Sequence, residues 1–209
     1  MSSQITRLVL QKRNPNRVSV FVDDAFFCGL NKETVLLLGL RKGQSISPER
    51  LLEMEAADAL IDAKTYVGNL LTRRTYSSVE VRRKLGLKGY AEEVAEKTVQ
   101  IFVDRGYLDD QQFARQFARE RATIKGHGAA RIRMDLRRKG IPSAFIDAAL
   151  QDILDAEDAL ERAEAIAQKR WMALQREPDP MKRRKRLFDF MLRRGYTMSA
   201  IQKIIEKLP

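Results

Sequence analysis

The sequence has little of the chemistry on which most catalytic and metal sites depend. Its 209 residues include one cysteine, Cys28, and one histidine, His127. A single cysteine excludes an intrachain disulfide framework and any site built from several thiolates. A single histidine does not favour a zinc site or a Ser-His-Asp arrangement, and His127 lies between two glycines, as expected for a loop residue. We therefore expect no metal and no other cofactor.

Long apolar runs and catalytic motifs are also missing. No stretch approaches the roughly 18 apolar residues of a membrane-spanning helix, and MSSQITRLVL lacks the apolar run and cleavage site of a signal peptide. The phosphate-loop pattern GxxxxGK[ST] does not occur. The paired carboxylates Asp109-Asp110 and Asp23-Asp24 have capping and turn roles that account for them. These observations predict a cytoplasmic protein that is not an enzyme and has no membrane partner.

The composition is that of a charged helical protein. Hydrophobic residues make up 44% of the chain and charged residues 32%, which favours a mainly helical fold with a real core. Lys and Arg number 39 against 28 Asp and Glu, a net charge of +11. An excess of this size favours polyanionic or acidic partners.

The first 47 residues have the pattern of a small β-rich module. Valines alternate with other residues over 17–22, which is the period of a half-buried strand. Turns are expected at Asn14-Pro15-Asn16 and at Asp23-Asp24, and Asn31 is expected to cap a short helix through Leu38. The predicted strands cover residues 5–10, 17–22 and 25–28.

The rest of the chain has helical periodicity and contains a repeat. A basic helix end, a glycine, a large apolar residue and an amphipathic helix occur three times. The three copies are VEVRRKLGLKGYAEEVAEKTV (79–99), RMDLRRKGIPSAFIDAAL (133–150) and DFMLRRGYTMSAIQKII (189–205). Their fixed points are Gly89, Gly140 and Gly195. A glycine just past a helix takes the left-handed conformation that ends it, so Tyr90, Ile141 and Tyr196 should pack back on the preceding helix.

Local signals place the other helix boundaries. Ser77 followed by Glu80 is a capping box, Asp109 should open the next repeat, and Asp179-Pro180 should start the middle helix of the last. Residues Asp155 to Asp158 mark the seam before the third unit. The fold class we predict is mainly α: three tandem three-helix repeats forming an elongated body, with a small N-terminal β-rich module. The predicted domains are 1–47 (β-rich module), 48–108 (linker helix and repeat 1), 109–154 (repeat 2) and 155–209 (repeat 3).

Positive charge is concentrated in the middle-helix segment of each repeat. Three segments, 73–88, 121–139 and 181–195, together hold 20 basic and 3 acidic residues. The rest of the chain holds 19 basic and 25 acidic residues. If similar units stack in similar orientation, these segments form a discontinuous basic strip suited to a nucleic acid or to a protein filament on one. The candidate binding residues are Arg73, Arg74, Arg82, Arg83, Lys84, Arg131, Arg133, Arg137, Arg138, Lys139, Arg183, Arg184, Lys185, Arg193 and Arg194.

The middle of the chain resembles the RecX family of bacterial regulators of the RecA recombinase. The resemblance lies in RTYSSVEVRRKL, RGYLDDQQFARQFARER and LRRKGIPSAFIDAAL, which follow the family's order and spacing over about residues 58–154. It implies three tandem three-helix units and binding along the groove of the RecA filament on single-stranded DNA. It further implies inhibition of ATP hydrolysis, strand exchange and filament growth, within recombination, DNA repair and the SOS response. The resemblance weakens in the third unit, where the long first helix and the 55-residue spacing differ from those of the second unit.

Two other hypotheses stay open beside a filament regulator. One is a direct DNA-binding protein whose repeats resemble helix-turn-helix domains and use their basic helices as phosphate clamps. A weaker one is an enzyme with a carboxylate site assembled from distant residues. The expected partners are the RecA filament and single-stranded DNA, bound directly or through the filament. We expect a monomer, with the β-rich module capping the repeats.

Overall fold

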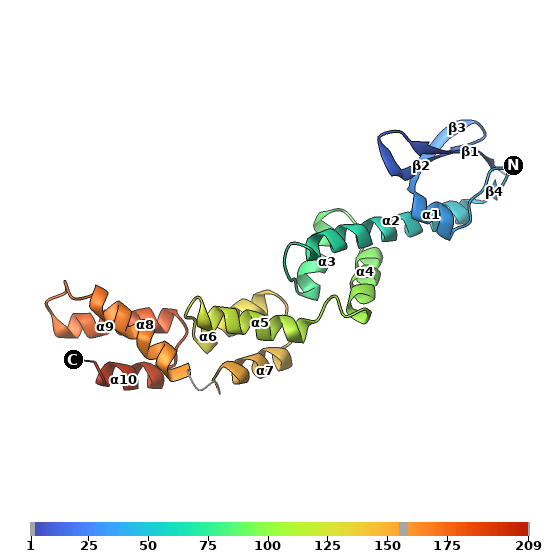
Figure 1. Cartoon of the computed structure of the whole chain (residues 1–209). Helices are drawn as coiled ribbons and strands as arrows, with labels where there is room; N and C mark the ends of the chain where they lie inside the picture. Colours follow the sequence, from blue (N-terminus) through green and yellow to red (C-terminus); the bar gives the residue numbers. More distant parts are fainter. Residues whose placement is uncertain (1–2, 155–158, 209) are drawn as a thin grey trace. The chain divides into compact units, whose positions relative to one another are not determined.

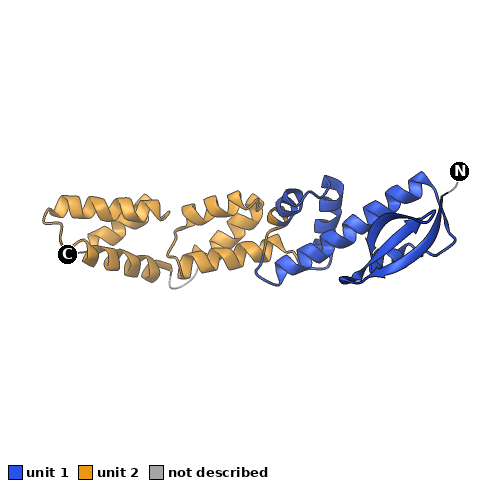
Figure 2. Ribbon diagram, turned by 90° about the horizontal axis from the view of Figure 1, so that it is seen from above, with its two compact units in different colours: residues 1–75, 81–107 blue, residues 76–80, 108–209 orange. Residues whose placement is uncertain are grey.

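The computed structural model describes residues 3–154 and 159–208. The chain forms two compact units (Figure 2). The first consists of residues 1–75 and 81–107, and the second of residues 76–80 and 108–209. The short segment 76–80 therefore packs with the second unit, although the residues on both sides of it belong to the first.

The N-terminal module is a four-stranded antiparallel sheet with the strand order β3-β2-β1-β4 (Figure 1). Alternate residues of the central strands point into a small core, which includes the fully buried Ile5 and Val20. This alternation confirms the strand period predicted from the sequence. The strands are β1 (Ser3–Gln11), β2 (Asn14–Val22), β3 (Ala25–Asn31) and β4 (Ser45–Ile46), with helix α1 (Lys32–Leu37) after β3.

The two hairpin turns differ in how well the sequence predicted them. Asp23 and Asp24 both have positive φ, 47° and 64°, as expected of the turn residues between β2 and β3. The turn predicted at residues 14–16 is wrong, because Asn14 already pairs with Gln11 and the chain reverses at residues 12–13. Pro15 is tolerated in β2 because the pairing with β3 begins only at Arg17, so no partner on that side needs an amide from Pro15.

A single helix, α2 (Pro48–Leu71), leads from the module into the first repeat. Ser47 caps it through Arg50, with Pro48 at the first helical position. The separate linker helix that we expected is continuous with the first helix of the repeat. The other helices are α3 (Ser78–Leu87) and α4 (Glu92–Asp104) in repeat 1, α5 (Asp110–Thr123), α6 (Ala129–Arg138) and α7 (Ser143–Leu154) in repeat 2, and α8 (Ala159–Ala173), α9 (Pro180–Arg193) and α10 (Met198–Glu206) in repeat 3.

The glycine after each middle helix ends it in the predicted way. Gly89, Gly140 and Gly195 have φ of 89°, 75° and 90°. In each case the amide of the following residue bonds back to the carbonyl five residues earlier, as Ile141 does to Leu136 at 3.2 Å. The three-helix repeat is therefore real, and the glycine sets a common register for α3, α6 and α9.

In that register the same two positions of each middle helix form the core. They lie eight and four residues before the glycine, one turn apart on one face, and each is fully buried at 0% exposure. The pairs are Val81 and Leu85 in α3, Ile132 and Leu136 in α6, and Leu187 and Met191 in α9.

Three other sequence predictions have mixed outcomes. The capping box is confirmed, since the Glu80 amide donates to Oγ of Ser77 at 3.1 Å. Asn31 precedes α1 without capping it through its side chain, which bonds to α2 instead. The seam predicted at residues 155–158 lies outside the described residues.

Candidate nucleic-acid interface

The shared register separates basic residues that face solvent from basic residues that join the repeats. Two positions before the glycine stand Arg138 in α6 and Arg193 in α9, and both are exposed. One position before it stand Lys139 and Arg194, and both are half-buried. Equivalent positions thus have the same degree of exposure in the second and third repeats.

Lys139 holds the end of α6 against the first turn of α3, within the second unit. Its Nζ lies 2.7 Å from Oε1 of Glu80, and the two side chains are only 22% and 13% exposed. Its carbonyl accepts a 2.8 Å hydrogen bond from Oγ of Ser77. The ammonium also lies 5.5 Å and 5.4 Å from the ring centroids of Phe113 and Phe117, a cation–π geometry. Lys139 therefore has a structural role in this joint.

Arg194 holds the end of α9 against the first turn of α6 in the same manner. Its Nη1 donates to the carbonyl of Gly126 at 3.1 Å. The amide of Gly128 donates to the carbonyl of Arg194 at 2.7 Å, and the amide of Ala130 donates to the carbonyl of Gly195 at 3.1 Å. Backbone amides at the start of α6, which have no partner within that helix, thereby donate to carbonyls at the end of α9, which have none within theirs. The positive end of one helix dipole thus faces the negative end of the other.

These two joints fix the spacing of the exposed basic ends in the second unit. The end of α9 lies at the start of α6, and the end of α6 lies at the start of α3. Because α6 has 10 residues, it is about 15 Å long. Arg193 therefore lies near the start of α6 and Arg138 lies at its end, about one helix length away.

Four further candidates make contacts within their own repeat. Arg183 donates from Nη2 to the carbonyl of the buried Trp171 at 2.9 Å, and its guanidinium lies 3.7 Å from the centre of the indole. The other three form ion pairs on the helix surface. Arg82 pairs with Glu92 and Glu96, Arg133 with Asp147, and Arg131 lies 3.5 Å from Asp135.

Of the nine remaining candidates, all but Lys84 are exposed. Arg74 is exposed, with Nη1 donating to the carbonyl of Thr75 at 2.8 Å, and Lys84 is half-buried. The others are exposed and form no ion pair with another residue of the described ranges 3–154 and 159–208. They are Arg73, Arg83, Arg137, Arg138, Arg184, Lys185 and Arg193.

Other groups with chemical potential have structural explanations. Burial lowers the pKa of His127, an effect that Asp135 opposes and nearby Arg194 reinforces, so the imidazole is neutral at pH 7. Burial also raises the pKa of the half-buried Cys28 to about 11, which keeps its thiol protonated and a weak nucleophile. Tyr76, which follows the basic pair Arg73-Arg74, is only 8% exposed and packs in the core, so its ring is not available for base stacking.

The described part of the chain holds no group of three or more His, Cys, Asp or Glu side chains placed to bind a metal ion. Among the described helices none is both long and apolar enough to cross a membrane.

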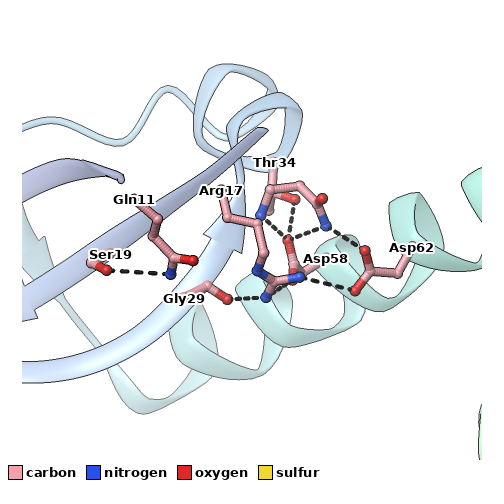
Figure 3. A network of polar contacts seen from close by, with 8 residues as sticks. Gln11, Arg17, Ser19, Gly29, Thr34, Asp58 and Asp62 are labelled. Atoms are coloured by element: carbon pink, nitrogen blue, oxygen red, sulfur yellow. Dashed lines mark hydrogen bonds and ion pairs between the residues drawn. The ribbon is translucent and has the colours of Figure 1, made fainter. Parts of the chain in front are cut away.

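A buried polar network that the sequence analysis missed fastens the N-terminal module to α2 (Figure 3). At its centre the carboxylate of Asp58, in a residue that is 8% exposed, accepts a 2.6 Å hydrogen bond from Oγ1 of Thr34. The same oxygen accepts from the amide and side chain of Asn31 at 2.6 Å and 3.0 Å. Arg17 reaches Asp58 at 3.5 Å and Asp62 at 3.3 Å. Burying a carboxylate is costly unless it is paired and hydrogen-bonded, so these partners allow Asp58 to be buried.

All comparisons with known proteins point to the same family. Four family models match the chain: the RecX N-terminal domain over residues 3–47, and the first, second and third RecX three-helix domains over 63–100, 109–150 and 156–205. A regulatory protein RecX of Clostridium botulinum is 31% identical over 206 residues, covering 98% of this chain and 96% of the relative. One from Clostridium perfringens is 29% identical with the same coverage.

Solved structures have the same fold. The crystal structure of a regulatory protein RecX superposes with a TM-score of 0.79 at 21% identity, covering 98% of this chain and all of the other. RecX from Lactobacillus salivarius gives a TM-score of 0.65 at 21% identity, over 73% of this chain and 97% of the other. With four matching domain models in order and relatives aligned over almost its full length, the chain belongs to the RecX family of regulatory proteins.

Proposed function

We propose that this protein regulates the RecA recombinase by binding along the groove of the RecA filament on single-stranded DNA. Bound there, it reduces ATP hydrolysis, strand exchange and filament extension, and it catalyses no reaction itself. Membership of a family of regulatory proteins supports this proposal. The observation that carries it is the recurrence of exposed arginines, Arg138 and Arg193, at the same register position of consecutive repeats. We further propose that it acts as a cytoplasmic monomer with the four domains predicted above.

All fifteen candidates contribute to the proposed interface, but not all in the same way. The exposed candidates that form no ion pair with a described residue make the direct contacts, because their charges are not neutralised within the protein. Arg82, Arg131, Arg133 and Arg183 exchange their contacts within the repeat for contacts with the partner. Lys139 acts indirectly, since its contacts set the joint between α3 and α6 and hence the spacing of the exposed charges. Arg194 sets the joint between α6 and α9 in addition to contributing its own charge. Replacing Lys139 would therefore confuse a loss of binding with a loss of structure.

The test is fluorescence anisotropy with bare single-stranded DNA and with the same DNA coated by nucleotide-bound RecA, at low and moderate salt. A preference for coated DNA that survives the increase in salt is the expected result, because protein contacts add apolar area to the charge contacts. Equal or better binding to bare DNA, lost as salt rises, would overturn the proposal in favour of a direct, phosphate-clamping DNA binder.

A charge reversal confined to exposed residues tests the interface itself. The double substitution Arg137→Glu with Arg138→Glu leaves Lys139 in place and should abolish binding to coated DNA with an unchanged helical circular dichroism spectrum. Arg184→Glu with Lys185→Glu tests the third repeat in the same way. The matched control is Arg41→Glu with Lys42→Glu, an exposed pair in the N-terminal module that changes the net charge equally. If the control weakens binding as much as the test pairs, the basic middle helices are not the interface.

A further inference from the structure

A basic cavity of about 400 Å³ lies in the second unit, where the loop after α5 meets α8 and α9. Among the described residues that line it, four have cationic side chains and none is acidic. The cations are Lys125, Lys169, Arg170 and Arg194. Lys169 and Arg170 lie outside the three basic segments of the sequence, and only Arg194 is among the candidates predicted from them.

The two arginines of the cavity are held in place before any ligand arrives. Both guanidinium groups lie over the ring of Phe190, Arg170 at 5.1 Å and Arg194 at 4.7 Å from its centroid. Arg194 is also anchored by the carbonyls of Lys125 and Gly126. Side chains fixed in this way lose less conformational entropy when they bind a ligand.

Arg170 has no ionic partner of its own among the described residues. Its guanidinium forms no ion pair with a described carboxylate, and its Nε atom is buried without an acceptor among them. An anion bound in the cavity, which Arg170 lines, would supply a counterion for this charge.

We propose that this cavity binds backbone phosphates of single-stranded nucleic acid. Its volume is in the range of small-molecule sites and is larger than one carboxylate needs. A single carboxylate would neutralise one of the four cations, whereas a strand supplies an anion at every nucleotide. Ile124, which is 72% exposed on the cavity wall, offers an apolar surface to a sugar or a base. This inference rests on the proposed function in that it assigns the nucleic acid of the filament to a particular site.

The test measures affinity of the full chain for a fluorescent oligothymidylate over a range of salt concentrations. Lys169→Gln with Arg170→Gln should bind roughly tenfold more weakly at low salt, as expected when charge-assisted hydrogen bonds are removed. The slope of log affinity against log salt should become less negative by about 0.7 for each phosphate that the variant no longer neutralises. The second variant, Lys125→Gln with Lys169→Gln, changes only exposed side chains and should give the same result even if loss of Arg170 disturbs packing around Phe190.

The matched control removes two charges from the same unit outside the cavity. Arg176→Gln with Lys203→Gln should leave the slope nearly unchanged, since both residues are exposed and neither lines the cavity. A slope for both cavity variants equal to that of the control would overturn the inference. So would normal binding to the oligonucleotide combined with weaker binding to RecA-coated DNA, because the cavity would then accept an acidic side chain of the recombinase. If instead the wild type shows no preference for coated DNA while the cavity variants have the shallower slope, the proposed function fails and this inference stands.

Discussion

Gly128 lies so close to the backbone of Gly195 that Gly128 has no room for a side chain. A Cβ atom on Gly128 would lie 2.4 Å from both the carbonyl carbon and the carbonyl oxygen of Gly195. The φ of Gly128 is −80°, which suits any residue, so the restriction comes from the neighbouring repeat and not from the local backbone. This close approach brings the start of α6 against the end of α9.

Gly128→Ala should therefore loosen the joint between the second and third repeats. A methyl group at this position forces the backbones apart, and we expect a loss of about 1–3 kcal/mol in the free energy of unfolding. Urea unfolding followed by circular dichroism measures it. The control is Gly86→Ala, which lies within α3 with nothing within 4 Å of the added Cβ and should gain about 0.5–1 kcal/mol. Equal stability of Gly128→Ala and the wild type would contradict the tight joint.

Lys139→Met should destabilise the joint between the first turn of α3 and the end of α6. The substitution removes the ion pair between Lys139 and Glu80, whose side chains are 22% and 13% exposed. We expect a loss of about 1–3 kcal/mol, between the values for exposed and fully buried ion pairs. Combining it with Glu80→Gln should recover part of the loss in a thermal unfolding experiment. If the double variant is less stable than Lys139→Met, the ion pair is not the source of the effect.

Asp58→Ala should release the N-terminal module from α2. It leaves the side chains of Thr34 and Asn31 without their shared acceptor, and we expect a loss of about 3–5 kcal/mol, as for breaking other buried charged networks. Hydrogen exchange of the β1 to β3 amides measures the opening of the module. The comparison is Asp62→Ala, whose side chain is 40% exposed and should cost about 1 kcal/mol or less. Similar exchange rates in the two variants would contradict a central role for Asp58.

The stability of the second unit should depend on pH through His127. The pKa of His127 is lowered in the folded protein from its ordinary 6.5, so the unfolded chain binds the proton more tightly. Its stabilising contribution is therefore complete above pH 6.5 and is lost as the pH falls through the lowered folded pKa. We expect the melting temperature to fall as the pH is lowered from about 7.5 to about 5, the range in which histidine titrates. The substitution His127→Gln should make this fall smaller. An unchanged pH profile in the variant would exclude His127 as the cause.

The features that were predicted correctly from the sequence depend on residues within one or two helical turns of each other. Gly140 ends its helix because of its own φ of 75°, and Ser77 caps α3 through an amide three residues away. Asp58 could have been noticed, since it continues the buried positions Met54 and Ile61 at helical spacing. A carboxylate in an apolar stripe is a signal that it has partners elsewhere. The cavity gave no comparable signal, because its cations come from separate segments.

The sequence by itself determined the repeat, the helix ends and the excess of positive charge, because these depend on residues close together in the chain. It could not separate Arg138, which faces solvent, from its neighbour Lys139, which is paired in the joint. Lys139 meets Glu80 across 59 positions of sequence, and Arg194 meets Gly126 across 68. Only the tertiary structure decides such pairs, because burial and long-range contacts set which charges are neutralised within the protein and which are left for a partner.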